Sequence, residues 1–250
     1  ATGMSEGGQI LVGGDYRGEN PQVRNASAVY MGEGTQLNTN ATGEGGSGGK
    51  AILWGDDTLK AYGEISATGV SEGGFVETSA GVVDLDLFVD VSASQGKGGT
   101  WLVDPYNIEI KSTIDGDSEE ALLYSGNLFT PNTDGEHVES SVLTITALRS
   151  ALAGGNSVVV ETTGSSGAQQ GDITLVDPLN INGRGASSLT LRAHDDVLIN
   201  ANIFDGNTTL IGDSLNLTLT SNYQNGGQDG GGNIEIASGV NITTYGGTFS

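Results

Sequence analysis

A short phrase of two glycines followed by apolar or β-branched residues returns along this chain. It occurs at Gly7–Val12, Gly48–Trp54, Gly73–Thr78, Gly98–Val103 and Gly231–Ile236. The interval from Gly48 to Gly73, and again from Gly73 to Gly98, is 25 residues. A fixed period in this range marks a repeat architecture. We therefore expect stacked repeats, with the glycine pairs shaping the coil rather than binding a ligand.

Composition narrows the class of protein. The 250 residues include 42 glycines but only 4 prolines, which predicts short strands separated by many turns. The net charge of −22 would repel nucleic acid, so we expect no nucleic-acid partner. There is no cysteine, which excludes disulfides and thiolate chemistry. The chain begins at Ala1 without a signal-peptide pattern and stops just after a Gly-Gly phrase, so we interpret it as a fragment of a longer protein.

Strand patterns fill both halves. Apolar residues alternate strictly with aspartates over Val83–Leu87, and the same period returns at Leu215–Leu219. No Asn-Gly hairpin joins adjacent strands, so a parallel β-helix is favoured over a sandwich or barrel. Glycine at the corners would supply positive φ. At roughly 20–25 residues and ~4.8 Å per coil, we expect about 10–12 coils and a rod on the order of 50 Å long. The expected inward residues are Ile52, Val76, Leu102, Leu175 and Leu191.

Residues 111–170 have a different pattern. Within Val142–Leu152, apolar residues spaced three and four apart follow Thr144, a candidate N-cap, and the run stops at Gly154-Gly155. This predicts one short helix near residues 144–153. We interpret residues 1–250 as a single β-helical shaft in which residues 111–170 form a decorated or inserted region.

Two stretches carry a family resemblance. The first contains GGKAILWGDDT at Gly48–Thr58 and YGEISATG at Tyr62–Gly69, and the second, Gly99–Ile108, reads GTWLVDPYNI. With Gly73–Ser79, they resemble filamentous-haemagglutinin-like proteins, the large exoproteins of bacterial two-partner secretion. The resemblance is specific over residues 48–110 and extends in texture over residues 7–240.

The resemblance implies a right-handed parallel β-helix and a place on the surface of, or secreted by, a Gram-negative-type bacterium. It implies an outer-membrane two-partner transporter during export, a host or bacterial surface receptor or glycan as ligand, and a role in cell adhesion or biofilm. The family's secretion domain carries an Asn-Pro-Asn-Gly motif, whereas this chain has Asn20-Pro21-Gln22. We therefore expect the shaft region downstream of that domain.

The sequence offers no convincing catalytic set. Only His137 and His194 could serve a nucleophile as base, there is no Gly-x-Ser-x-Gly elbow, and 31 acidic residues make some close carboxylate pair inevitable. We predict a non-enzymatic protein with no catalytic residues and no cofactor. The alternatives are a carbohydrate-active β-helix enzyme, a polymerising filament or matrix subunit that self-associates end to end, and the shaft of a contact-dependent toxin-delivery protein.

Metal and aromatic patterns are also weak. Asp115–Glu119 begins like a calcium loop but lacks its sixth-position glycine and distal glutamate, and Gly226–Gly230 echoes a calcium repeat only once. With His194–Asp196 interpreted as a turn, we predict no metal site beyond weak calcium binding to the acidic surface. Aromatic residues in the repeated phrases are expected to pack in the core or corners rather than form a sugar platform: Trp54, Trp101, Tyr62, Tyr106 and Phe75.

Five Asn-x-Ser/Thr triplets are candidate glycosylation acceptors. Their asparagines are Asn25, Asn40, Asn207, Asn216 and Asn241. Such triplets arise by chance in a chain rich in asparagine and threonine, but some adhesins of the resembled family are glycosylated at such sites. We retain them as a hypothesis.

Overall fold

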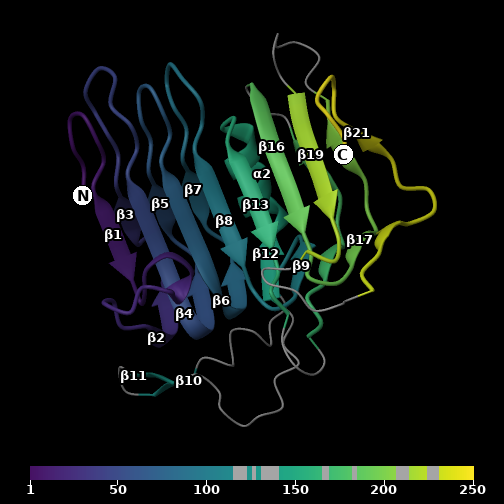
Figure 1. Cartoon of the computed structure of the whole chain (residues 1–250), viewed down its shortest axis with the longest axis horizontal. Helices are drawn as coiled ribbons and strands as arrows, with labels where there is room; N and C mark the ends of the chain where they lie inside the picture. The colour runs from purple at the N-terminus through teal and green to yellow at the C-terminus, as the bar shows by residue number, and fades with distance from the viewer. Residues whose placement is uncertain are drawn as a thin grey trace.

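A computed structural model of the chain describes residues 1–114, 141–164, 169–181, 185–206, 214–223 and 231–250, and the backbone of the antiparallel pair β10 (Leu123–Ser125) and β11 (Leu128–Thr130). The described coils form a parallel β-helix, as the repeat predicts. The chain winds through up to three faces, and strands of one coil pair in parallel with those of the next (Figure 1). The two termini lie toward opposite ends of the stack.

The first face holds seven described strands, all parallel. In order along the stack they are β1 (Gln9–Val12), β4 (Lys50–Ala61), β6 (Phe75–Leu85), β8 (Thr100–Asp104), β13 (Ser157–Glu161), β16 (Ala186–Arg192) and β19 (Ser214–Thr220). Their register is continuous, with Lys50 beside Phe75 and Phe75 beside Thr100. Each of the first four of these strands begins directly after the glycine pair of one of the first four repeated phrases.

The second face begins with the far halves of β4 and β6, which cross the corner through a register shift between Gly55 and Thr58. Its other strands are β2 (Ala26–Met31), β12 (Ser141–Thr144), β9 (Ile108–Lys111), β14 (Ile173–Leu175), β17 (Val197–Ile199) and β20 (Ile234–Ile236). Although β12 follows β9 in the chain, it lies between β6 and β9. Residues 141–144 therefore fill a rung that the chain passed over earlier.

The third face combines strands and a helix. Its strands are β3 (Gln36–Asn38), β5 (Glu64–Ser66), β7 (Phe88–Asp90), β15 (Leu179–Ile181), β18 (Ile203–Asp205) and β21 (Ile242–Thr243). Helix α2 (Ile145–Ala153) packs against both β7 and β15, so it occupies one rung of this face. The predicted cap is confirmed, because Thr144 Oγ1 accepts a hydrogen bond from the Ala147 N–H at 3.1 Å.

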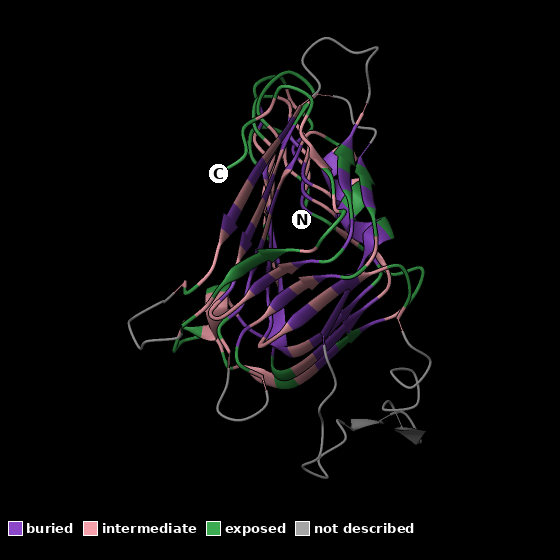
Figure 2. Cartoon of the chain, turned by 90° about the vertical axis from the view of Figure 1, so that its right-hand side faces the viewer, coloured by how far each residue is buried: buried purple, intermediate pink, exposed green. Residues whose placement is uncertain are grey.

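The core lies between the faces, where buried residues from successive coils form one continuous cluster (Figure 2). Val76, Leu175 and Leu191 belong to it, as predicted. The prediction is wrong for Ile52 and Leu102, which are buried but lie outside this cluster. Ala51, Val76 and Trp101 form one inward-facing column, and Ile52 and Leu102 each follow a member of it in the strand. Because successive side chains of a strand point to opposite sides, Ile52 and Leu102 face outward.

The expected number of coils is also wrong. Successive first-face strands place Gln9, Lys50, Phe75, Thr100, Ser157, Ser188 and Asn216 in one column. The intervals are 41, 25, 25, 57, 31 and 28 residues, so the 25-residue period holds for only two steps. The seven described first-face rungs, at ~4.8 Å each, span about 30 Å.

The glycine pairs act differently from the prediction. None of the eight glycines in the first four pairs has positive φ. They lie where the chain entering the first face touches the chain leaving the third, a contact that we call the neck. The second glycine of each pair closes it: Gly49 N–H donates to Thr39 O at 2.8 Å, Gly74 N–H to Ala67 O at 2.7 Å, and Gly99 N–H to Val91 O at 2.7 Å. A Cβ on Gly73 would lie 1.7 Å from Val91 O, so the close approach requires glycine.

Candidate functional site

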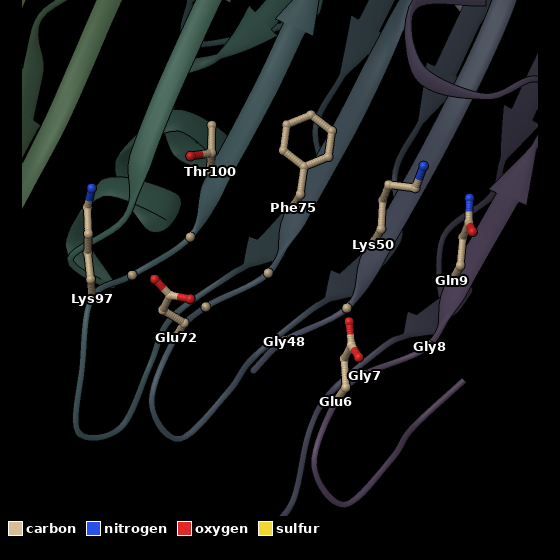
Figure 3. A pocket seen from close by; sticks show the side chains of 15 residues that line it. Glu6, Gly7, Gly8, Gln9, Gly48, Lys50, Glu72, Phe75, Lys97 and Thr100 are labelled. Carbon is tan, nitrogen blue, oxygen red and sulfur yellow. The ribbon is translucent and has the colours of Figure 1, made fainter. Parts of the chain in front are cut away.

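An open groove runs across the coils above the necks. Its floor is the backbone of the glycine pairs, and its volume is about 710 Å³ (Figure 3). On one side lie Glu6, Glu72 and Lys97, from loops beyond the necks, and on the other lie Gln9, Lys50, Phe75 and Thr100, from the first strand positions. Because glycine has no side chain, these two rows stand apart and leave the groove between them.

The groove continues toward the C-terminal coils. Lys97 and Gly98 also line a second hollow of about 550 Å³, whose other residues include Gly155, Ser157 and Ser188. Thr100, Ser157 and Ser188 occupy one column of the first face. The groove wall therefore changes from charged and aromatic residues at the N-terminal coils to hydroxyls farther along.

The groove's charged side chains are two carboxylates and two lysine ammonium groups. Both carboxylates, Glu6 and Glu72, are exposed. Within the described ranges no three His, Asp or Glu side chains are placed to hold a metal ion. His194 lies elsewhere, with Nδ1 3.0 Å from Gln170 O, and His137 is outside the described residues. The groove offers charge, hydrogen bonds and one aromatic ring.

Beside the groove, residues 13–25 form a loop that we call the strap. Its two ends are joined by a hydrogen bond of 2.7 Å from Ala26 N–H to Gly13 O. The short 3-10 helix η1 (Tyr16–Gly18) packs on β4. Gly14 and Gly18 approach the Trp54 ring so closely that a Cβ at Gly18 would lie 2.5 Å from Cε2. Packing of η1 on the outward side of β4 accounts for the burial of Ile52 there.

Arg17 anchors the strap through a buried ion cluster. Its backbone N–H donates to Glu77 at 3.1 Å, and its guanidinium lies 3.0 Å from Glu161 Oε1 and 3.6 Å from Asp104 Oδ2. Glu161 also accepts from Arg192, whose guanidinium stacks 4.6 Å from the centre of the Tyr223 ring. Arg17 has φ 55°, a left-handed conformation that is unfavourable for a side-chain-bearing residue. The cluster's contacts hold it there.

The carboxyls of this cluster are strongly perturbed. Burial raises the pKa of Glu77 to about 7, against the opposing hydrogen bond from the Arg17 N–H. Burial, reinforced by the neighbouring Glu161 charge, raises the pKa of Asp104 to about 7. Asp15 behaves in the opposite way, because hydrogen bonds from Asn20, Lys50 and the Tyr16 N–H lower its pKa to about 2.

The strap also contacts the groove wall. Lys50 Nζ, in the wall, pairs with Asp15 Oδ1 at 2.9 Å. The Phe75 ring meets the Tyr16 ring edge-on, with centroids 5.8 Å apart. Two wall residues are thus held by the strap, so the groove and the ion cluster are physically connected.

The candidate glycosylation asparagines lie in unlike places. Asn25 Nδ2, in the strap, donates to Gly18 O and Asp56 Oδ1. Asn40 Oδ1 accepts from the Thr68 N–H, and Asn216 Oδ1 from the Thr248 N–H, so both join coils. Asn241 is exposed, and Asn207 lies outside the described residues. Glycosylation stays a prediction, with Asn241 the most accessible described acceptor.

Other predicted features have mixed outcomes. Trp101 is fully buried and its Nε1 donates to Thr78 Oγ1 at 3.0 Å, as core packing predicts. Trp54 packs under the strap, and Phe75 is half-buried in the groove wall. The two calcium-like stretches, residues 115–119 and 226–230, lie outside the described residues.

The sequence analysis does not predict the strap or its cluster, because Arg17 and Glu161 are 144 residues apart in the chain. One signal was present. In the repeat register, Glu77 falls between Ile52 and Leu102, so a charge interrupts an apolar column. Such a charge needs a buried partner, and no neighbouring repeat supplies one.

The described residues contain no helix long and apolar enough to cross a membrane. Comparison of the sequence with protein-family models and with curated proteins finds no match to either.

Proposed function

We propose that this chain is part of the shaft of a non-enzymatic, filamentous-haemagglutinin-like exoprotein, secreted by or displayed on a Gram-negative-type bacterium. The observation that carries the proposal is the stack itself. Each rung pairs with its neighbours around one continuous core, which is a way to build length. Together with the resemblance over residues 48–110, this favours a stalk that contributes to adhesion or extracellular matrix.

The test uses the intact exoprotein in its own bacterium. Antibodies against residues 1–250 should label intact cells, and labelling should disappear when the outer-membrane transporter of the two-partner type is deleted. Deleting the exoprotein gene should reduce adhesion or biofilm. Undiminished surface labelling without any such transporter, or antigen confined to the cytoplasm, would contradict the proposal.

A carbohydrate-active enzyme is the alternative from a different class. It would need a protonated acid facing an open groove, whereas Glu6 and Glu72 are exposed and the perturbed Glu77 and Asp104 lie in the buried Arg17 cluster. The proposal predicts no cleavage of acidic or neutral polysaccharides by the purified protein. Cleavage that Glu72→Gln abolishes would instead establish the enzyme.

The filament and toxin-delivery alternatives share the same stack. Light scattering after size exclusion tests the filament alternative, because the molar mass of a polymerising subunit would increase with protein concentration. Toxin delivery requires an activity outside these 250 residues, and inhibition of neighbouring cells by the intact exoprotein would reveal it.

A further inference from the structure

We propose that the strap, residues 13–25, is a pH-operated clasp that is closed on the first face in acid and released as the carboxyls beneath it lose their protons. The inference is independent of the exoprotein's role. It rests on how the strap is fastened, on the charge balance of its anchor and on what the strap covers.

The fastening is concentrated at one residue. Arg17 reaches carboxylates on β6, β8 and β13, through Glu77, Asp104 and Glu161. The strap's ends are tied by the Ala26–Gly13 hydrogen bond, and Gly13, Arg17 and Gly18 all have positive φ. A closed loop of this kind can lift while its ends stay in place. Release would also free Arg17 from its left-handed conformation.

The charges at the anchor do not balance when every group is ionised. The cluster holds three carboxylates and two guanidinium groups: Asp104 and Glu161 lie against the Arg17 guanidinium, Glu161 also against that of Arg192, and Glu77 accepts from the Arg17 backbone N–H. The side chains of Glu161 and Asp104 are 1% and 5% exposed, so a surplus negative charge has little solvent to stabilise it. One bound proton restores neutrality. The other charged residues of the strap are Asp15, Glu19 and Arg24, and Lys50 and Asp56 lie at its contacts; Asp15 and Lys50 form a pair, and Asp56 accepts from Trp54 Nε1.

The direction of the response follows from burial. The pKa values of Glu77 and Asp104 are both raised to about 7 in the closed form. Lifting the strap would expose these carboxyls to water and return their pKa values toward about 4. The closed form therefore binds more protons than the open form, and rising pH between about 4 and 7 favours opening. Opening would separate Tyr16 from Phe75 and Asp15 from Lys50, and so alter the groove wall.

Hydrogen exchange of the intact chain, corrected for the intrinsic pH dependence, tests the clasp. Protection of residues 13–25 should fall at least about tenfold between about pH 5 and pH 8, while β16 keeps its protection. Trp54 emission should shift to the red over the same range, and Trp54→Phe should remove that shift. The Glu77→Gln, Asp104→Asn double variant should keep the strap protected throughout, and Glu72→Gln, at an exposed carboxyl, should behave as the wild type.

Three outcomes would overturn the proposal. One is wild-type strap protection that changes less than about twofold over this range. A second is a parallel loss of protection in β16, which would indicate global unfolding. The third is a folded double variant that keeps the wild-type pH response. If the double variant does not fold, the wild-type exchange and the Trp54 signal still decide.

Discussion

The N-terminal and C-terminal coils close their turns by different means. In the N-terminal coils, glycine pairs let two chain segments meet at the neck, and the bulged strands β4 and β6 carry the chain around the next corner without a break. In the C-terminal coils, strands are short and separate, and an asparagine or aspartate stands directly before each of the strands β9, β14, β17 and β20. The comparison shows two ways to close a turn in one fold. Where glycine leaves no side chain in the way, two backbone segments contact each other directly. Where asparagine or aspartate stands at the turn, its side-chain oxygen can accept a hydrogen bond from a backbone N–H.

The C-terminal arrangement is a hydrogen-bonded ladder. Asn107 Oδ1 accepts from the Asp172 N–H at 3.0 Å, Asp172 Oδ1 from the Asp196 N–H at 3.1 Å, and Asp196 Oδ1 from the Asn233 N–H at 2.6 Å. Each side chain thus accepts a hydrogen bond from a backbone N–H in the next coil. Without this acceptor the N–H at the corner would be unpaired, at a cost in stability. The last glycine phrase belongs to this region. Gly231-Gly232 precedes β20, a second-face strand, so it is not a neck.

The largest expected effect comes from a methyl group added at a neck. Gly73→Ala places Cβ 1.7 Å from Val91 O, a backbone atom that cannot rotate away, and should lower the free energy of unfolding by about 3 kcal/mol. Gly231→Ala has nothing within 4 Å and should change it by less than about 0.5 kcal/mol. Urea denaturation measures both, and equal effects would erase the difference between the two regions.

The next effect is a pH dependence that arises from Glu77, a buried carboxyl of the N-terminal coils. The folded-state pKa of Glu77, about 7, lies above its unfolded value of about 4.5, so the folded state binds more protons in this window. The stability that this group contributes should therefore be fully present below about pH 4.5 and decline as the pH rises to about 7, by about 3 kcal/mol. Glu77→Gln should remove that part of the decline in thermal unfolding scans. An unchanged slope in the variant would show that Glu77 is not its source.

A smaller effect is expected from the ladder. Asn107→Ala removes the acceptor for both the Gly171 and Asp172 N–H groups and should cost about 1–2 kcal/mol in urea denaturation. Asn107→Asp keeps the acceptor oxygen and should cost less. If alanine and aspartate are equally destabilising, the hydrogen bonds are not what the residue contributes.

Much of the fold could be predicted because several local signals agree. Thr144, the apolar spacing after it and Gly154 together define α2, and alternation defines β19. The direction of the Ile52 side chain, into the core or out of it, could not be predicted. Ala51, Ile52 and Leu53 are all apolar, so no alternation shows which of them face the core, and a shift of one residue exchanges the two sides. The number of coils could not be predicted either, because the 57-residue interval from Thr100 to Ser157 interrupts a period seen only twice. The strap depends on a contact between Arg17 and Glu161, 144 residues apart, which no local pattern encodes.

The central claim is that the glycine pairs of the repeated phrase close a neck in the N-terminal coils, whereas the last pair, Gly231-Gly232, does not. Amide exchange at these glycines tests the claim most directly. Residue-resolved exchange should find Gly49, Gly74 and Gly99 strongly protected, because each donates to a carbonyl across the neck at 2.7–2.8 Å. The amide of Gly231, which is exposed, should exchange rapidly. Rapid exchange at Gly49, Gly74 and Gly99, in a chain whose β6 and β16 amides stay protected, would contradict the account.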